Sequence, residues 1–224
     1  MPVTEIVHLH TLSGNVDAAY RAVCLRCIQA QDEWCDANLP QQPKGLEARG
    51  VAVFQNTNDP SETLLTAHWD SVAEHGIWIA SATNQEIFPL LQEQVDLSRL
   101  VYYHVDGVSA FSGSENPPLI PVLKAPVISL THYFVSSERK QEFDRAWQGV
   151  KANLDGFARP YVHRGGWKIE KGEDAQEEVF VSVGGWQSVE TAEGFIGSEE
   201  GKKFEETLDA TAAKKVVKYF TRFL

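Results

Sequence analysis

The sequence predicts an α+β protein made of two tandem units, each with the element order β-α-β-β-α-β. Three observations support this prediction. The pattern of residues 50–81 returns in residues 165–198, strand and helix periodicities alternate along both copies, and a segment rich in proline and serine separates them. We therefore expect a first unit at residues 1–108, a linker at 109–126 and a second unit at 127–224.

The internal repeat includes strands, turns and helix starts. Gly50 begins the run Gly-Val-Ala-Val-Phe, and Gly165 begins Gly-Gly-Trp-Lys-Ile. A turn follows in each copy, at residues 58–60 (Asn-Asp-Pro) and at 172–174 (Gly-Glu-Asp). Each copy then reaches a tryptophan, Trp69 or Trp186, just before a helix. Such self-similarity indicates one supersecondary unit used twice.

Apolar spacing and turn residues divide each copy into its elements. In the first copy we expect strands at 5–12, 48–55, 62–69 and 100–108, with helices at 15–34 and 71–94. Ser71 and Glu74 have the spacing of a capping box at the start of the second helix. In the second copy we expect strands at 127–135, 160–169, 177–186 and 214–223, with helices at 137–154 and 189–212.

This element order predicts a four-stranded antiparallel sheet with both helices on one face. The other face needs a partner if it is apolar, and the tandem copy supplies one. We therefore expect the two sheets to face each other as a barrel around an internal cavity.

Composition limits the class of protein. A chain of 224 residues with 43% hydrophobic content can bury a full core. The net charge of −11 and the pI near 5.1 argue against nucleic acid and anionic membranes as partners. We find no 18-residue apolar run and no secretion signal, so we expect a cytoplasmic protein. Cys24 and Cys27 lie on a helical stripe and predict core packing rather than a redox or zinc pair.

Given these residues, the sequence resembles the dimeric α+β barrel superfamily of ferredoxin-like proteins. The likeness is to its antibiotic-biosynthesis-monooxygenase-like and EthD-like branches. It rests on the run from Gly50 to Phe54, the Asp59-Pro60 turn, the run from Leu65 to Ser71, and His75 and Ser81. The resemblance implies a tandem duplication that forms a pseudo-dimer within one chain, with a further homodimer left open. Members of the superfamily include cofactor-free oxygenases, decarboxylases, polyketide cyclases, isomerases, haem-degrading enzymes and stress proteins.

Histidine is distributed unequally between the copies. Of the seven histidines, five lie in the first copy: His8, His10, His68, His75 and His104. The positions that match His75 and His68 in the second copy are Ala192 and Gly185. We therefore place the reaction site in the first half.

Strand alternation predicts where these imidazoles lie. His8 and His10 share one face of the first strand, while Val7 and Leu9 face the helices. The third and fourth strands flank the first strand, so His68 and His104 are expected near the same surface. This reasoning predicts four imidazoles near one surface, with His8 and His10 pointing into the cavity.

His75 is the leading catalytic candidate because it lies near a capped helix N-terminus, whose positive end keeps an imidazole neutral and basic. We expect His75, His8, His10 and His104 to be catalytic. Tyr102 is expected to share a face with His104 and to polarise a substrate carbonyl. The expected substrate-binding residues are His68, Tyr102, Tyr103, Trp78 and Tyr133.

The leading hypothesis is a cofactor-independent enzyme that uses histidine acid–base chemistry on a hydrophobic, oxygenated molecule of polyketide-like or aromatic type. It would act as a cyclase, decarboxylase or isomerase of secondary metabolism. A cofactor-free monooxygenase of the same substrates is one alternative. A metalloenzyme ligated by His8, His10, His68 and His104 is another, and a non-catalytic ligand-binding or stress-response barrel is a third. No dinucleotide-binding or phosphate-binding motif occurs, so we expect no cofactor. The leading hypothesis assigns no metal ligand, and metal binding by the histidines stays open as an alternative.

Overall fold

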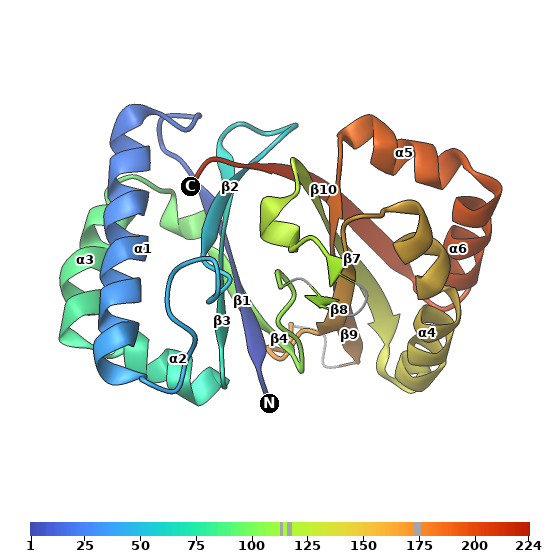
Figure 1. Cartoon of the computed structure of the whole chain (residues 1–224), viewed down its shortest axis with the longest axis horizontal. Helices are drawn as coiled ribbons and strands as arrows, with labels where there is room; N and C mark the ends of the chain where they lie inside the picture. Colours follow the sequence, from blue (N-terminus) through green and yellow to red (C-terminus); the bar gives the residue numbers. More distant parts are fainter. Residues whose placement is uncertain (113, 116–117, 173–175) are drawn as a thin grey trace. The chain divides into compact units, whose positions relative to one another are not determined.

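The structure is a computed structural model that describes residues 1–112, 114–115, 118–172 and 176–224 (Figure 1). It divides into two compact units, Met1–Ser109 with Phe220–Leu224, and Ala110–Tyr219. Pro117 of the expected linker and Glu173 and Asp174 of the expected turn lie outside the described residues.

The first unit has the predicted element order, with its second helical segment in two pieces. In chain order its elements are β1 (Val3–His10), α1 (Ala18–Asn38), β2 (Ala52–Asn56), β3 (Glu62–Trp69), α2 (Val72–Ile79), α3 (Ala82–Gln92), a 3-10 turn (Leu97–Arg99) and β4 (Val101–Asp106). The strands form an antiparallel sheet in the order β4-β1-β3-β2. The expected position of the first strand, between the third and the fourth, is confirmed.

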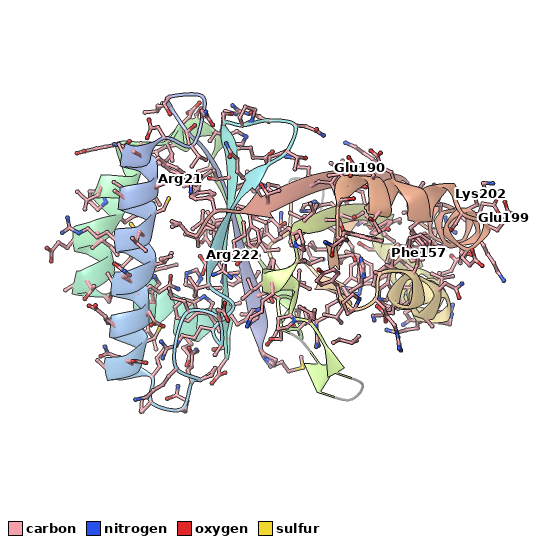
Figure 2. All side chains as sticks on the ribbon, turned by 45° about the horizontal axis from the view of Figure 1, so that its top comes forward. Arg21, Phe157, Glu190, Glu199, Lys202 and Arg222 are labelled. Atoms are coloured by element: carbon pink, nitrogen blue, oxygen red, sulfur yellow. The ribbon has the colours of Figure 1, made fainter. Side chains whose placement is uncertain are left out.

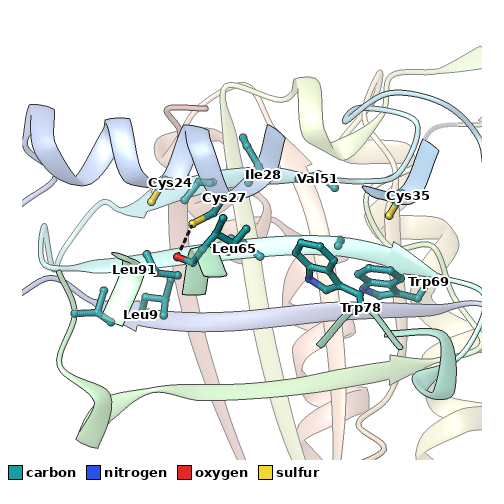
Figure 3. Close-up of a cluster of buried hydrophobic side chains, with 14 of the residues drawn as sticks. Leu9, Cys24, Cys27, Ile28, Cys35, Val51, Leu65, Trp69, Trp78 and Leu91 are labelled. Atoms are coloured by element: carbon teal, nitrogen blue, oxygen red, sulfur yellow. Dashed lines mark hydrogen bonds between the residues drawn. The ribbon is translucent and has the colours of Figure 1, made fainter. Parts of the chain in front are cut away.

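The helices α1, α2 and α3 lie on the same side of this sheet (Figure 1). Asp17 caps α1 by accepting a hydrogen bond from the Tyr20 amide, at 2.8 Å. The apolar stripe of α1, which includes Cys24 and Cys27, packs over Leu9 and Leu65 of the sheet (Figure 3). All three cysteines are buried and free, so the expectation of core packing is confirmed.

The predicted single helix at 71–94 is wrong in one respect, because the chain forms two helices there. Ala80 ends α2, and the Ser81 side chain then accepts a hydrogen bond from the Asn84 amide at 3.1 Å to begin α3. A serine inside an apolar helical pattern can serve as an N-cap instead of continuing the helix. The same correction applies at 189–212, where Ser198 ends α5 and caps α6.

The second unit repeats the order with β7 (Val127–Ser136), α4 (Lys140–Phe157), β8 (His163–Trp167), β9 (Glu177–Trp186), α5 (Val189–Gly197), α6 (Glu199–Asp209) and β10 (Lys214–Arg222). A 3-10 turn at Ser137–Arg139 precedes α4, and two short strands, β5 (Ser114–Glu115) and β6 (Pro118–Leu119), precede β7. The sheet order is β10-β7-β9-β8. Glu199 and Lys202 form an ion pair at 2.8 Å on the outer side of α6 (Figure 2).

The last strand takes part in both units. Residues from Lys214 to Tyr219 belong to the second unit, while Phe220 to Arg222 pair with β2 in the first. Part of the expected linker is packed, since Ala110, Phe111 and Val122 are buried. In the described part of the chain, no helix has the length and apolar character that crossing a membrane requires.

Candidate active site in the first unit

A cavity of about 510 Å³ lies between the sheet and the helices of the first unit. This volume is in the range of small-molecule binding sites. Its wall is mainly apolar, from Val7, Leu9, Leu65, Trp78, Ile87, Phe88, Leu91 and Leu100. Figure 3 shows part of this apolar lining, with Leu9 and Leu65 on the strands and Leu91 and Trp78 on the helices. The cavity therefore suits a hydrophobic ligand.

Glu5 places one carboxylate in this apolar wall. It lies on the same face of β1 as Val7 and Leu9, and only 6% of its surface is exposed. Trp69 at the end of β3 donates its indole N–H to Glu5 Oε2, at 2.8 Å. Among the described residues, Glu5 Oε1 has no hydrogen-bond partner. One carboxylate oxygen is thus held in place while the other remains available to a ligand.

His75 completes the polar end of the cavity. Its Nε2 lies 3.3 Å from Glu5 Oε2, and its Nδ1 lies 2.7 Å from His104 Nε2. The Trp69 ring stacks on the imidazole, with ring centres 4.8 Å apart and an angle of 18° between the planes. If Nε2 of His75 and Nε2 of His104 carry the protons, each contact has one donor and one acceptor. Glu5, His75 and His104 then form one buried chain of proton-carrying groups.

Helix α2 positions His75. The Ser71 side chain accepts a hydrogen bond from the Glu74 amide at 3.1 Å, as the capping box predicts. The return contact differs, since the Glu74 carboxylate accepts from the Asp70 amide at 2.9 Å rather than from that of Ser71. With its N-terminus fixed in this way, the first turns of α2 hold His75 over the start of β1 and the end of β3.

The expected convergence of four imidazoles on one surface is not what the structure has. His104 lies opposite Glu5 in the β1–β4 register, so it faces the helices. His8 and His10 lie on the other face of the sheet, because side chains alternate along β1 and these two are out of phase with Glu5. His68 lies on that face too, because its partner in the register is Thr4. His8 and His10 lie opposite the helices, as strand alternation predicts, whereas the face of His104 depends on the register between β4 and β1, which the sequence does not reveal.

The remaining predicted site residues lie in three different places: at the cavity, on the opposite face of the sheet, and in the second unit. Tyr102 and Trp78 line the cavity, and Tyr102 shares its face with His104 as predicted, with ring centres 6.2 Å apart. Tyr103 is buried on the opposite face, 6.0 Å from the His8 ring. Tyr133 belongs to the core of the second unit, where burial raises its pKa well above the usual value.

His68 has a different neighbourhood from the one expected. Its ring lies against Gly50, which has a φ of +65°. A Cβ at position 50 would occupy the space of the ring, so this close approach and the positive φ both require glycine.

Sequence reasoning missed Glu5 and Gln31. Gln31 on α1 is buried and lines the cavity, and its carboxamide has no hydrogen-bond partner within the described ranges. Glu5 had a sequence signal, because it alternates with Val3, Val7 and Leu9 on a face that is otherwise apolar. A lone carboxylate on such a face is worth attention, since burial of an ionisable group is costly.

The second unit keeps the scaffold of this site without its charge. Trp186 occupies the position of Trp69, opposite Val127 as Trp69 is opposite Val3. Its indole N–H donates to the Ser129 hydroxyl at 2.9 Å, where the first unit has Glu5. Ala192 stands where the first unit has His75, and the cavity there has a volume of about 40 Å³. The second copy therefore lacks the counterparts of Glu5 and His75 and has much less space.

Comparisons with known proteins find relatives by structure. No model of a known protein family matches the chain, and no curated protein sequence matches it. A candidate monooxygenase from Lactobacillus acidophilus NCFM matches with a TM-score of 0.64 and 12% identity, over 99% of this chain and 93% of that chain. A candidate monooxygenase from Fusobacterium nucleatum subsp. nucleatum has a TM-score of 0.64 and 8% identity, over 100% and 93%. The chain adopts the dimeric α+β-barrel fold.

An anthrone oxidase-like protein has the same fold, with a TM-score of 0.57 and 14% identity, over 99% of this chain and 92% of that chain. At these identities the likeness shows the α+β-barrel fold alone, since one fold supports many reactions. Both halves of the fold are present in one chain as a tandem duplication. The chemistry has to be argued from the residues of the site.

Proposed function

We propose that the first unit is a cofactor-independent acid–base enzyme that acts on a hydrophobic, oxygenated small molecule. One observation carries the proposal. The Glu5 carboxylate and the His75 imidazole are in contact at the wall of an apolar cavity of about 510 Å³. A carboxylate and an imidazole that are held together away from bulk water are a typical pair for proton transfer.

Glu5 is the proposed general base. Its Oε1 is the acceptor that a substrate can reach, while Oε2 is held by Trp69 and lies beside His75. The substrate would transfer a proton to Oε1 from a phenol or from a carbon next to a carbonyl. His75, supported by His104, would stabilise the carboxylate before the transfer and supply a proton path afterwards. This assigns His75 a partner role beside Glu5.

The cavity indicates the substrate class. Its apolar wall would hold a planar ring system, and Gln31 offers a carboxamide to a carbonyl or hydroxyl oxygen of the substrate. Tyr102 lines the same cavity and is 49% exposed, so its hydroxyl group can meet a ligand at the opening. A polyketide-like or polycyclic aromatic molecule with a ketone or phenol group fits these features.

Proton removal leaves an enolate or phenolate with several outcomes. Return of the proton to a different carbon isomerises the substrate, and attack of the enolate on a second carbonyl carbon closes a ring, with the proton passing to the alkoxide. Transfer of the acid proton of a β-keto acid to Glu5, followed by loss of carbon dioxide, leaves the same kind of enolate, which takes that proton back from Glu5. These non-oxidative outcomes need only the groups at this site.

Oxygenation is the second candidate. Structures of the same fold are named as candidate monooxygenases and as an anthrone oxidase-like protein. Molecular oxygen can add to the substrate carbanion, and uptake of one proton gives a hydroperoxide, so that R–H and O₂ become R–OOH. Oxygen consumption that is stoichiometric with substrate loss would favour this outcome over the non-oxidative ones.

Hydrogen exchange at carbon tests the proposal before the final product is known. Anthrone and a panel of phenolic ketones are incubated in D₂O with purified, chelator-treated protein, and nuclear magnetic resonance follows loss of the acidic C–H signal. We expect the protein to accelerate exchange. Glu5→Gln should reduce the acceleration by roughly 100-fold or more, which is typical for removal of a general base.

Glu178→Gln is the matched control, because Glu178 is a buried carboxylate in the second unit with only 8% of its surface exposed. This variant should keep the exchange rate. Melting curves establish that both variants fold and that the ligand still binds. Exchange that persists in Glu5→Gln, or that falls equally in Glu178→Gln, would remove Glu5 from the proposed role.

A further inference from the structure

A cluster of different chemistry lies on the face of β1 opposite the cavity. His10 is the last residue of β1, and Glu62, the first residue of β3, lies directly opposite it in the register. Asp59 belongs to the turn that joins β2 to β3. One ligand atom from each of these three residues lies within 4.8 Å of the others. All three side chains are in the first unit, so the cluster is complete within it.

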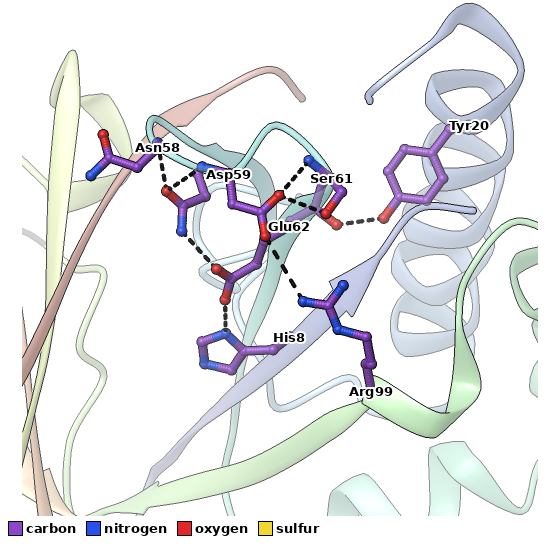
Figure 4. A network of polar contacts seen from close by, with 9 residues as sticks. His8, Tyr20, Asn58, Asp59, Ser61, Glu62 and Arg99 are labelled. Atoms are coloured by element: carbon purple, nitrogen blue, oxygen red, sulfur yellow. Dashed lines mark hydrogen bonds and ion pairs between the residues drawn. The ribbon is translucent and has the colours of Figure 1, made fainter. Parts of the chain in front are cut away.

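The backbone holds the three residues in place. The Glu62 amide donates to the Asp59 carbonyl oxygen at 3.0 Å, and the Thr11 amide donates to the Ser61 carbonyl oxygen at 2.8 Å. Ser61 also donates to Asp59 Oδ1 from its amide at 3.0 Å and from its hydroxyl at 2.6 Å (Figure 4). The turn therefore presents Asp59 in a fixed orientation, with Oδ2 outside the hydrogen bonds of the turn.

A second layer of residues orients Glu62. His8 Nδ1 lies 2.9 Å from Glu62 Oε1, and the Asn56 side-chain amide donates to Oε2 at 2.6 Å (Figure 4). Each of the two carboxylate oxygens of Glu62 is thus oriented by a neighbouring side chain. Side chains that hold a ligating carboxylate or imidazole from behind are a regular feature of metal sites.

Charge and burial favour a cation here. Glu62 is 2% exposed and His10 is 8% exposed, so two of the three groups are nearly removed from water. Arg99 approaches Asp59 Oδ2 at 3.9 Å from a largely exposed position, which compensates weakly for two carboxylates. The Asp59 side chain is 42% exposed and opens a route from solvent to the cluster.

We propose that His10, Asp59 and Glu62 bind one divalent transition-metal ion, such as Zn²⁺ or Mn²⁺. One imidazole and two carboxylates are ligands that these ions accept, and the imidazole disfavours Mg²⁺ and Ca²⁺. Three protein ligands leave further positions for water. The site is independent of the proposed acid–base function, because it lies on the other face of the sheet from Glu5 and His75.

Metal titration of the intact chain tests this proposal. Tag-free protein is stripped with a chelator, and calorimetry and equilibrium dialysis with metal analysis measure binding of ZnCl₂, MnCl₂ and MgCl₂. We expect one Zn²⁺ or Mn²⁺ ion per chain, and binding of Mg²⁺ at least 10-fold weaker. His10→Ala and Asp59→Asn should each weaken Zn²⁺ binding by roughly 10- to 100-fold or more. Asp59→Asn retains the oxygen that Ser61 contacts, so the turn should stay intact.

Asp96→Asn is the matched control, because Asp96 is a nearby carboxylate whose amide contacts the His10 carbonyl oxygen at 2.8 Å but whose side chain is not among the three ligands. It should bind Zn²⁺ like the parent protein. Cobalt substitution gives a second readout, since visible bands of bound Co²⁺ should disappear in His10→Ala. The proposal is overturned if no ion binds below millimolar concentration, or if the ligand variants bind as tightly as the control.

Discussion

Glu5 and Ser129 occupy matching positions in the first strands of the two units, and they differ in charge. Each accepts a hydrogen bond from the indole N–H of a tryptophan at the end of the neighbouring strand, at 2.8 and 2.9 Å. In the first copy the acceptor also lies 3.3 Å from the imidazole of His75. The same scaffold therefore supports a hydrogen bond in one unit and a candidate acid–base site in the other.

His163 is a histidine whose ring is buried and whose two ring nitrogens have no hydrogen-bond partner in the described part of the chain. Its ring packs against Trp186, with centres 4.7 Å apart. Burial, and to a lesser extent the positive charge of Lys151, lower its pKa from 6.5 to about 3. The native state therefore keeps this imidazole neutral through the whole weakly acidic range.

This shift predicts a loss of stability in acid. Below pH 6.5 the unfolded chain binds a proton at His163 that the native state refuses until the pH reaches about 3. The free energy of unfolding should therefore fall, by about 1 kcal/mol per pH unit, as the pH decreases from 6.5 toward 3. Urea unfolding at pH 7, 6, 5 and 4 measures the slope.

His163→Phe should flatten this pH dependence, because it removes the group that titrates. His132→Gln replaces a half-buried histidine of the same unit and serves as the control that keeps the slope. Equal slopes in the parent protein and in His163→Phe would assign the acid sensitivity to other groups.

At the scale of elements, helix α2 connects local sequence to the site. Ser71 caps α2 and Ser188 caps α5, and each accepts a hydrogen bond from the amide three residues later, at 3.1 and 3.2 Å. Only α2 carries a histidine that contacts the carboxylate of the cavity. The two caps therefore make the same hydrogen bond, and we expect them to stabilise their helices to a similar extent. Only the cap of α2 also positions a residue of the candidate site.

Replacement of the caps separates these effects. Ser71→Ala and Ser188→Ala should each lower the free energy of unfolding by about 1 kcal/mol, which is typical for loss of an N-cap. Only Ser71→Ala should also reduce carbon hydrogen exchange, by several-fold, because the first turns of α2 then hold His75 less firmly. Parallel melting curves and exchange rates measure both quantities. A similar loss of exchange in Ser188→Ala would mean that stability, rather than the position of His75, explains the effect.

The whole molecule is a duplication whose two halves have diverged in cavity size. The first unit contains about 510 Å³ and the second about 40 Å³. A cavity of roughly 10–15 Å³ on this scale holds one water molecule, so the second cavity has room for water and not for an aromatic ring. One ligand per chain is expected although the fold is present twice.

Titration with a fluorescent apolar probe tests this stoichiometry. We expect a value near one probe per chain for tight binding, measured at protein concentrations well above the dissociation constant. Val7→Phe should weaken binding by about 10-fold, because Val7 lines the first cavity and the larger ring fills part of it. A stoichiometry near two, with both sites equally tight, would contradict the asymmetry.

Much of the fold was readable from local patterns. The repeat, the β-α-β-β-α-β order and the central position of β1 all follow from short-range periodicity and the topology that this order favours. The internal caps at Ser81 and Ser198 were missed because a serine in a helical pattern can either continue the helix or cap a new one. The hydrogen bond of its side chain decides between these two structures.

The site was readable only in part. His75 and Trp78 were found because α2 has a clear start and places both in its first two turns, where they line the cavity. Glu5 was overlooked although its alternation with the apolar residues of β1 was visible in the sequence. The face of His104 was predicted wrongly, because the register between β1 and β4 is a long-range property. The cluster of His10 with Asp59 and Glu62 depends in the same way on the pairing of β1 with β3.

The amino-acid order by itself determined which elements form and that the first copy holds most of the imidazoles, since periodicity, capping and composition act over a few residues. Tertiary structure alone decided that Glu5 meets His75, and that His104 lies on the helix-facing side, away from His8 and His10. The physical reason is that strand pairing joins residues far apart in the chain. A step of one residue in that pairing exchanges the two faces of a sheet.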